Sequence, residues 1–445
     1  MIKLNTTEQV LTGWGRTAPS RAVVAAPADL TQLQEIIAAQ PARGLVARGA
    51  GRSYGDAAQN GGGYILHPVT SPHFELDVAA ATVRASASTT FTALLEQLVP
   101  HGLLLPVLPG TRHLTVGGAV AADVHGKNQH GDGSISAWID EIDLVDGDSK
   151  RRTLLPGTDG FRATVGGMGL TGVILEVKFR LFRISSTALQ VTTRRLPDLD
   201  SLLAAMDASS SRYSVAWIDT TASRRSFGRG VLDTGDHLAQ PGPADRDGLA
   251  YRAGRPPLAP ELPFCPFTPV TARAFNGLWY RAAARELTGT VSLARYFHRL
   301  DAVSQWNRAL GPRGFLQYQF MVPQNADTII TEVLTALRRH RGAPFLGTLK
   351  RFGPSSENYL SFPGPGWSLA VDLPAGNRRL RTVLDHLDRR VADVGGRVYL
   401  AKDARLRPDT FANMYRQIEA WRTARQRLDP RGVFCSDLGR RLGLC

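Results

Sequence analysis

Three glycine-rich segments constrain the fold more than any other feature of the sequence. Residues 47–56 (ARGAGRSYGD), 109–128 (PGTRHLTVGGAVAADVHGKN) and 163–172 (ATVGGMGLTG) each gather several glycines and small residues. Glycine allows the backbone to approach another group closely and to adopt conformations that other residues avoid. Such turns can hold an anion against backbone N–H groups, and small side chains let a flat ring lie against the main chain. Three of them in this order predict a phosphate-bearing ligand with a flat ring.

The first part of the chain is expected to form a domain of short strands, at residues 1–183. At 445 residues, the chain is long enough for two or three domains. Between residues 23 and 181, short β-branched runs alternate with glycine-rich turns, which predicts strands, including one at 114–126. Helices are expected at residues 29–39, which follow Pro27, and at residues 90–98, where apolar residues recur at helical spacing.

The pattern changes after residue 183. Strand-like segments at residues 215–220, 315–323 and 367–374 alternate with amphipathic helices at residues 326–339 and 380–394. About four strands with two helices on one face predict an α+β domain at residues 184–395, with an antiparallel sheet covered by helices. Residues 396–445 are expected to return to the first domain.

A segment rich in Pro, Gly and Asp lies between residues 233 and 276. Loops of this length inside a compact domain usually cover a binding site or are disordered. We expect a mobile lid over the active site here.

Charge limits the partners of the chain. The net charge of +14 is carried mainly by arginines that are spread along the sequence without Lys/Arg blocks. This distribution argues against nucleic-acid binding. It leaves open an anionic membrane surface, a phosphate-bearing ligand, or an arginine-rich genome with no functional meaning.

Hydropathy and cysteine content point to an ordinary cytoplasmic protein, at most in peripheral contact with a membrane. No stretch reaches the roughly 20 apolar residues that a membrane helix needs, and the first ten residues lack the pattern of a signal peptide. Cys265, Cys435 and Cys445 are too few and too scattered to predict disulfides or a metal site.

The motifs resemble those of FAD-binding oxidoreductases of the vanillyl-alcohol-oxidase type, which share a two-domain, PCMH-type FAD-binding fold. The resemblance covers nearly the whole chain and rests on GRSYGDAAQNGGG, LPVLPGTRHLTVGGAVAADVHGKNQH, ATVGGMGLTG, WNRALGPRGFLQYQF and YLAKDAR. Within this family the chain is most similar to the branch that oxidises decaprenylphosphoryl-β-D-ribose. The resemblance therefore implies an α+β fold and an FAD-dependent oxidation of a sugar hydroxyl.

The resemblance also implies that FAD is held without a covalent bond. In many relatives that oxidise soluble sugars, a histidine linked to the flavin stands where this chain has Arg52, and arginine cannot form that bond. The implied cofactor-binding residues are Ala50, Gly51, Arg52, Ser53, Tyr54, Gly55, Asn60, Pro109, Gly110, Thr111, Thr115, Gly117, Gly118, Ala121, Ala122, His125, Gly126, Asn128, Gly167, Gly169, Thr171 and Tyr399.

Three residues are candidates for the chemistry. Removal of a hydride from an alcohol carbon also needs a group that takes the hydroxyl proton. Lys402 matches the active-site lysine of the family and can take that proton if burial lowers its pKa. His125 and Lys127 match a basic pair beside the flavin, and in a strand they would face the same side. Without the resemblance, an internal histidine is more often structural.

The substrate pocket departs from the pattern of that branch. Its implied residues are Trp217, Phe297, Gln317, Gln319, Lys350, Phe352, Ser368, Ala370 and Lys402. Ser368 and Ala370 replace Asn and Cys, Phe297 replaces Tyr, and Val215 replaces Ser. Because these changes remove polar groups, we expect the pocket to select a different pattern of hydroxyls.

Three functions are compatible with these features. The first is oxidation of the 2-hydroxyl of a polyprenylphosphoryl-β-D-ribose to a 2-keto sugar, which a short-chain reductase then converts toward arabinose for the cell wall. The second is the same flavin chemistry on a soluble sugar, alditol or aldonolactone. The third is a basic binding protein without turnover, which the intact glycine-rich segments argue against.

Overall fold

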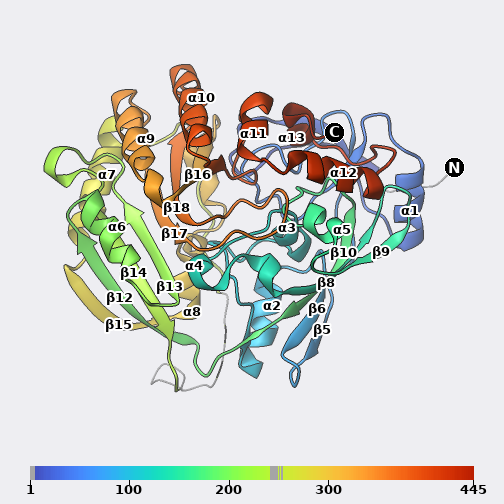
Figure 1. Cartoon of the computed structure of the whole chain (residues 1–445), viewed down its shortest axis with the longest axis horizontal. Helices are drawn as coiled ribbons and strands as arrows, with labels where there is room; N and C mark the ends of the chain where they lie inside the picture. Colours follow the sequence, from blue (N-terminus) through green and yellow to red (C-terminus); the bar gives the residue numbers. More distant parts are fainter. Residues whose placement is uncertain (1–5, 241–248, 250, 252–253) are drawn as a thin grey trace.

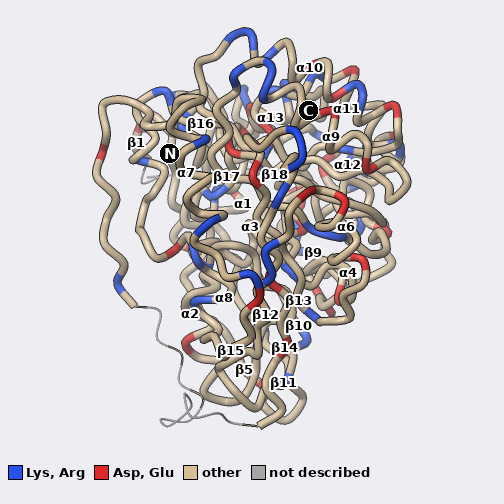
Figure 2. Tube along the Cα trace, turned by 90° about the vertical axis from the view of Figure 1, so that its left-hand side faces the viewer, with Lys and Arg blue, Asp and Glu red and all other residues tan. Residues whose placement is uncertain are grey.

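The computed structural model describes residues 6–240, 249, 251 and 254–445. It has two lobes (Figure 1). The first lobe is formed by the N-terminal part of the chain together with the C-terminal helices, and the second is built around one large sheet. Lys and Arg are scattered over the face seen in Figure 2, with acidic residues between them. No helix in the described ranges is long and apolar enough to cross a membrane.

The first lobe contains two main sheets. The four-stranded sheet has the order β1-β2-β4-β3 and comprises β1 (Thr6–Leu11), β2 (Ser20–Ala25), β3 (Leu45–Ala47) and β4 (Tyr64–Leu66). The five-stranded antiparallel sheet has the order β5-β6-β10-β8-β9 and comprises β5 (Phe74–Asp77), β6 (Thr82–Ser86), β8 (Ile139–Val145), β9 (Arg151–Leu154) and β10 (Val173–Arg180). A short pair joins β7 (Leu103–Leu104) to β11 (Phe182–Arg183).

Both helices predicted in this lobe are confirmed. They are α1 (Leu30–Ala38) and α2 (Phe91–Leu98). Asp29 and Thr90 cap them, because each side chain accepts a hydrogen bond from a backbone N–H of the first turn. Two short helices, α4 (Gln129–Asp132) and α5 (Asp159–Thr164), follow later in the lobe.

The strand predicted at residues 114–126 is wrong, because this segment contains helix α3 (Val116–Ala121). The hydroxyl of Thr115 caps the helix by accepting from the N–H of Gly118. The helix packs so closely that a Cβ on Gly117 would lie 2.9 Å from the Cβ of Ala87. Capping and close packing therefore favour a helix here over the strand that was expected.

The second lobe is an antiparallel sheet of eight strands in the order β15-β12-β14-β13-β17-β18-β16-β19. Its strands are β12 (Ala188–Leu196), β13 (Tyr213–Ile218), β14 (Gly230–His237), β15 (Glu286–Ser292), β16 (Phe315–Pro323), β17 (Leu346–Phe352), β18 (Gly366–Pro374) and β19 (Arg397–Val398). The prediction of about four strands was too low, since the polar strand β12 and the edge strand β15 carry little hydrophobic signal. Helices α6 (Leu199–Asp207), α9 (Thr328–Arg339) and α10 (Arg378–Asp393) lie over one face (Figure 1).

The segment 233–276, which was predicted to be a long loop, contains regular secondary structure at both ends. Strand β14 continues to His237, and helix α7 (Pro269–Ala282) begins within the segment. Thr268 and Thr271 form a capping box at the start of α7, with Pro269 in the first turn. Residues 241–248, 250 and 252–253, where part of the mobile lid was expected, lie outside the described residues. The short helix α8 (Leu293–Phe297) follows β15.

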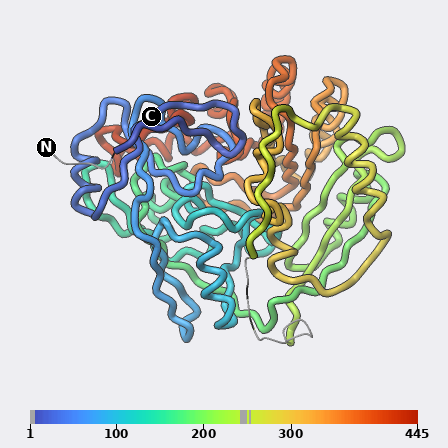
Figure 3. Tube along the Cα trace, turned by 180° about the vertical axis from the view of Figure 1, so that it is seen from behind, coloured from blue at the N-terminus to red at the C-terminus, as the bar shows by residue number. Residues whose placement is uncertain are grey.

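The C-terminal helices lie against the first lobe. They are α11 (Pro408–Met414), α12 (Ile418–Leu428) and α13 (Asp437–Leu442), and Figure 3 shows this end of the chain beside the N-terminal strands. The indole N–H of Trp421 on α12 donates to the carbonyl of Ala163 at 3.0 Å. Phe434 forms an isolated parallel bridge with Leu45 in β3.

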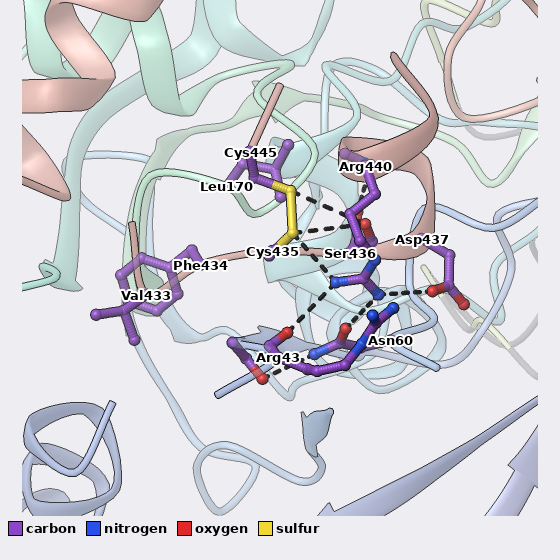
Figure 4. The surroundings of a disulfide bond; sticks show 12 residues. Arg43, Asn60, Leu170, Val433, Phe434, Cys435, Ser436, Asp437, Arg440 and Cys445 are labelled. Carbon is purple, nitrogen blue, oxygen red and sulfur yellow. Dashed lines mark hydrogen bonds and ion pairs between the residues drawn. A yellow bond between two sulfur atoms is a disulfide. The ribbon is translucent and has the colours of Figure 1, made fainter. Parts of the chain in front are cut away.

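Two of the three cysteines form a disulfide, which corrects the prediction that all three are ordinary residues. Cys435 is bonded to Cys445 across helix α13 (Figure 4). Gly443 adopts a left-handed conformation that ends α13 and turns the chain back, so the two sulfur atoms meet. A short helix with a tight turn thus joins cysteines that the spacing alone did not connect. Cys265 remains free.

Candidate active site

A cavity of about 600 Å³ lies where the two lobes meet. This volume is typical of small-molecule sites. The three glycine-rich segments line one side, and side chains from β13, β14, β16, β17 and β18 line the other. Tyr399 and Lys402, from the loop after β19, complete the lining.

The register of the sheet brings the predicted substrate residues together. Gln319 of β16 is paired with Ala370 of β18, and Ser368 of β18 is paired with Lys350 of β17. Residues two apart in a strand face the same side, so Gln317 also points to the cavity. Residues at the alternate positions of β16 and β18 are buried in the core: Tyr318, Phe320, Leu369 and Val371.

Most of the predicted cofactor residues line this cavity. Those that do are Ala50, Gly51, Arg52, Ser53, Tyr54, Pro109, Gly110, Thr111, Thr115, Gly117, Gly118, Ala121, Ala122, His125, Gly169 and Tyr399. The predicted substrate residues Trp217, Phe297, Gln317, Gln319, Lys350, Ser368, Ala370 and Lys402 line it as well, together with Lys127 and Val215.

Seven predicted site residues lie behind the cavity lining: Gly55, Asn60, Gly126, Asn128, Gly167, Thr171 and Phe352. Several of them hold the loops in shape. Asn60 donates to the carbonyl of Gly44 at 2.8 Å, and a Cβ on Gly55 would lie only 1.9 Å from the carbonyl oxygen of Asp403. The ring of Phe352 packs edge-on against the imidazole of His125 at 4.8 Å.

The glycine-lined wall fits a flat, anionic dinucleotide such as FAD. Gly118 faces the cavity, and a Cβ there would contact only the Thr115 hydroxyl, at 3.2 Å. The surface of α3 is therefore flat enough to accept a ring. Arg48 and Arg52 add positive charge to the same wall, and the Arg52 guanidinium lies 4.1 Å from the centre of the Trp14 ring. Positive charge of this kind suits a pyrophosphate.

Helix α13 fixes the position of this wall relative to Lys402. Arg441 of α13 donates to both carboxylate oxygens of Asp56, at 2.7 and 2.9 Å. The same guanidinium forms an ion pair of 2.8 Å with Asp403, the residue after Lys402. One arginine thus ties the first glycine-rich segment to the Lys402 loop.

His125 lies at the centre of the polar cluster. The amide nitrogen of Gln319 is 3.1 Å from Nε2 of His125, and Nζ of Lys350 is 3.4 Å from Nδ1. Burial, with the neighbouring Lys350 and Lys402, lowers the pKa of His125 well below its usual range. The imidazole is therefore neutral, and Nε2 accepts from the Gln319 amide.

Lysine is rare in the chain, and half of its lysines line the cavity. The six positions are Lys3, Lys127, Lys150, Lys178, Lys350 and Lys402, and the cavity contains Lys127, Lys350 and Lys402. Burial lowers the pKa of Lys127 to about 7 and that of Lys350 to about 8. It also lowers the pKa of Lys402, although Asp372 partly opposes the shift. Unlike arginine, a buried lysine can exchange a proton near neutral pH.

From the sequence, His125 and Lys127 were expected as a pair on one face of a strand. Both line the cavity, but their segment is a turn in which His125 forms only an isolated bridge with Ser134. Nζ of Lys127 donates to the carbonyl of Tyr296 and lies 3.9 Å from the centre of the Tyr296 ring. The two side chains thus line the cavity from a turn and not from a strand.

Asp372 is a buried acid beside the site that was not among the predicted residues. Its Oδ1 accepts a hydrogen bond of 2.7 Å from the Gln317 amide, and the residue is fully buried. Burial raises its pKa, which the Gln317 hydrogen bond and Lys402 partly oppose. The signal was present in the alternation of β18, because Asp372 lies two residues after Ala370 and so on the same face.

Similarity to known proteins agrees with this geometry. Residues 21–155 match the model of an FAD binding domain, and residues 373–442 match that of D-arabinono-1,4-lactone oxidase. Decaprenylphosphoryl-β-D-ribose oxidase of Mycolicibacterium smegmatis is 38% identical over 454 residues, which cover 99% of this chain and 98% of that protein. The chain belongs to the decaprenylphosphoryl-β-D-ribose oxidase family of FAD-dependent oxidases. It is therefore an FAD-dependent oxidoreductase.

Other known oxidases are similar to shorter parts of the chain. Alditol oxidase of a Streptomyces species is 30% identical over 174 residues, which are 38% of this chain and 41% of that protein. L-gulonolactone oxidase 5 of Arabidopsis thaliana is 30% identical over 150 residues, or 32% of this chain and 25% of that protein.

Proposed function

We propose that this oxidase converts the 2-hydroxyl of a polyprenylphosphoryl-β-D-ribose to a 2-keto sugar. The carrying observation is that Lys402 and Lys350 line the same cavity as the glycine-rich segments, with Nζ of Lys350 3.4 Å from Nδ1 of His125. Full-length similarity to the mycobacterial enzyme supports the same substrate class. The 2-keto product suits a separate reductase that completes the epimerisation.

Each polar group has a role in this proposal. Bound FAD supplies the acceptor for the hydride. Lys402, whose Nζ lies 3.7 Å from the centre of the Tyr54 ring, orients the reacting hydroxyl and takes its proton in the neutral form. Gln317 and Gln319 hydrogen bond the sugar, and Lys127 and Lys350 attract the phosphate while they are charged.

An apolar surface at the cavity supports a lipid-linked substrate. The α7 surface consists of Val270, Phe275, Leu278 and Trp279, all exposed, and Phe275 and Trp279 also line the cavity. An exposed apolar patch of this kind marks a contact site for lipid or protein. Arg273 and Arg281 on the same helix provide charge for anionic headgroups. We infer that the prenyl chain leaves along this surface, where the protein contacts a membrane peripherally.

A soluble sugar, alditol or aldonolactone is the second candidate substrate. The match of residues 373–442 to D-arabinono-1,4-lactone oxidase favours it. The apolar residues Val215, Phe297 and Ala370 in the pocket also fit a different pattern of hydroxyls.

Anaerobic reduction of the bound flavin distinguishes the two candidates. The purified enzyme is mixed with farnesylphosphoryl-β-D-ribose, free ribose, an alditol or an aldonolactone, and flavin absorbance is followed. Rapid bleaching by the first compound alone is expected. Lys402→Met should slow bleaching by about 10²- to 10⁴-fold, the usual contribution of a proton acceptor, whereas Lys178→Met on strand β10 serves as the matched control. Bleaching by the soluble compounds only would show that the substrate is a soluble sugar, alditol or aldonolactone.

Vesicle flotation tests the α7 surface. The wild-type enzyme should float with vesicles that contain anionic phospholipid, and the double variant Val270→Asp/Leu278→Asp should not. Leu287→Asp, at an exposed apolar residue of the edge strand β15, is the matched control and should still float. Equal flotation of all three proteins would exclude α7 as the contact surface.

A further inference from the structure

We infer that Asp372 is a positioning residue of this active site, which holds the Gln317 amide with its oxygen toward the cavity and keeps a counter-charge beside Lys402. The inference rests on the proposed function, because it assigns Gln317 and Lys402 to substrate contact. Asp372 itself lies behind the cavity lining and acts through these two residues.

The environment of Asp372 differs from that of the structural acids in the same lobe. Asp388 and Asp219 are buried too, but each forms a direct ion pair, with Arg405 at 2.6 Å and with Arg229 at 2.8 Å. Within the described ranges, Oδ2 of Asp372 has no hydrogen-bond partner. Burial of a carboxylate with so few partners is costly, so its presence is poorly explained by stability.

The hydrogen bond from Gln317 fixes the direction of that amide. The NH₂ group of Gln317 donates to Oδ1 of Asp372 at 2.7 Å, while burial raises the pKa of this carboxyl to about 7. The same nitrogen lies 3.4 Å from the Tyr54 hydroxyl. Because the nitrogen is turned to the protein, the amide oxygen is turned toward the cavity as an acceptor.

Gln319 is held in the same way by different partners. Its amide nitrogen lies 3.1 Å from Nε2 of His125 and 3.3 Å from the hydroxyl of Ser368. Strand β16 therefore offers two amide oxygens on one face, two residues apart. Two such acceptors match two neighbouring hydroxyl donors, which is the pattern of a sugar diol.

Charge links Asp372 to Lys402. Burial lowers the pKa of Lys402 most, Asp372 on β18 raises it, and Lys350 on β17 lowers it by a smaller amount. Lys402 also faces the ring of Tyr54, whose hydroxyl stays protonated because burial raises its pKa, and His125 is neutral. Removal of the Asp372 charge would leave burial and Lys350 to lower the pKa of Lys402 without opposition. Lys402 would then lose its proton at a lower pH.

Two substitutions separate the two roles. Asp372→Asn removes the charge but keeps an oxygen that can accept from Gln317, and Asp372→Leu removes both. Asp219→Asn is the matched control, because it removes a buried carboxylate of the same lobe that belongs to neither the cavity nor its neighbours. Flavin content and thermal unfolding identify any variant that does not fold.

Competitive acetylation of the holoenzyme measures the protonation of Lys402 directly. Trace acetic anhydride labels neutral amines, peptide mass spectrometry reports each lysine across a pH series, and Lys150 and Lys178 are internal references. In Asp372→Asn, the labelling midpoint of Lys402 should fall by about one pH unit, so that Lys402 reacts several-fold faster at neutral pH. Asp219→Asn should match the wild type. A Lys402 midpoint that is unchanged in Asp372→Asn overturns the inference, even if Asp372→Leu does not fold.

Steady-state kinetics test the amide role. Asp372→Leu should raise the KM for the sugar about tenfold beyond that of Asp372→Asn, since only the leucine variant frees the Gln317 amide to turn. Equal KM values in the two variants contradict that role. If no polyprenylphosphoryl pentose reduces the wild-type flavin, the proposed function fails, and the acetylation result still decides the link between Asp372 and Lys402.

Discussion

The Gln319 amide nitrogen lies 3.1 Å from Nε2 of His125, and this contact joins the substrate sheet to a glycine-rich segment of the other lobe. Neither lobe alone contains the polar cluster. The site therefore depends on how the lobes are held together, as well as on the residues that line it.

Gly118 should control cofactor binding without controlling folding. A Cβ at this position would contact only the Thr115 hydroxyl, and the rest of a leucine side chain would project into the space assigned to the flavin ring. We expect Gly118→Leu to fold and to be purified with little or no FAD. Flavin absorbance per protein and the unfolding temperature of the protein measure both effects. Gly289→Leu, at a glycine of β15 with equally open surroundings, should keep its flavin.

Binding of an anionic sugar should weaken as pH rises from 6.5 to 9. The pKa values of Lys127 and Lys350, about 7 and about 8, mean that both amines are charged below this range and neutral above it. A phosphodiester keeps its charge throughout, so loss of the lysine charges should raise the dissociation constant about tenfold. Titration with farnesylphosphoryl-β-D-ribose, followed by the flavin spectrum, measures this change. A neutral sugar with the same pH dependence would refute the explanation.

FAD should leave the protein completely on denaturation. Arg52 occupies the cavity wall, where its Nε donates to the carbonyl of His113 at 3.1 Å, and an arginine forms no covalent bond to flavin. Precipitation with acid should leave a colourless pellet and a yellow supernatant. The mass of the denatured chain should equal that of the polypeptide alone; an added mass equal to FAD is the contrary result.

Loss of the disulfide should weaken both stability and FAD retention. A bond that closes a loop of this size contributes roughly 3 kcal/mol, and here it anchors α13, whose Arg441 binds Asp56 and Asp403. Cys435→Ser should lower the unfolding temperature and speed the release of FAD, and a reducing agent should do the same to the wild type. Cys265→Ser, at the free cysteine, is the control. Unchanged FAD release would limit the disulfide to a stabilising role.

The sequence predicted those parts of the fold that local patterns determine. The capped helices α1 and α2 and strand β16 occur where periodicity placed them. Helix α3 was missed because its stability comes from the Thr115 cap and from close packing on residue 87, which a local pattern does not contain. The disulfide was missed because only the turn at Gly443 brings its cysteines together.

For the site, the motifs predicted which residues surround the cavity but not how they are connected. The bond between His125 and Gln319 spans the two lobes, and the contact between Asp372 and Gln317 depends on strand register. Register is set by the whole sheet, so a single strand sequence does not reveal it.

Alternate residues of strand β18 have two different roles. Ser368 and Ala370 face the ligand, whereas Leu369 and Val371 lie in the core. Substitution of Ser368 and Ala370 can therefore alter the preferred alcohol. Leu369 and Val371, which stabilise the core, stay the same. A library restricted to positions 368 and 370 should thus yield enzymes with new substrate preferences and a nearly constant melting temperature.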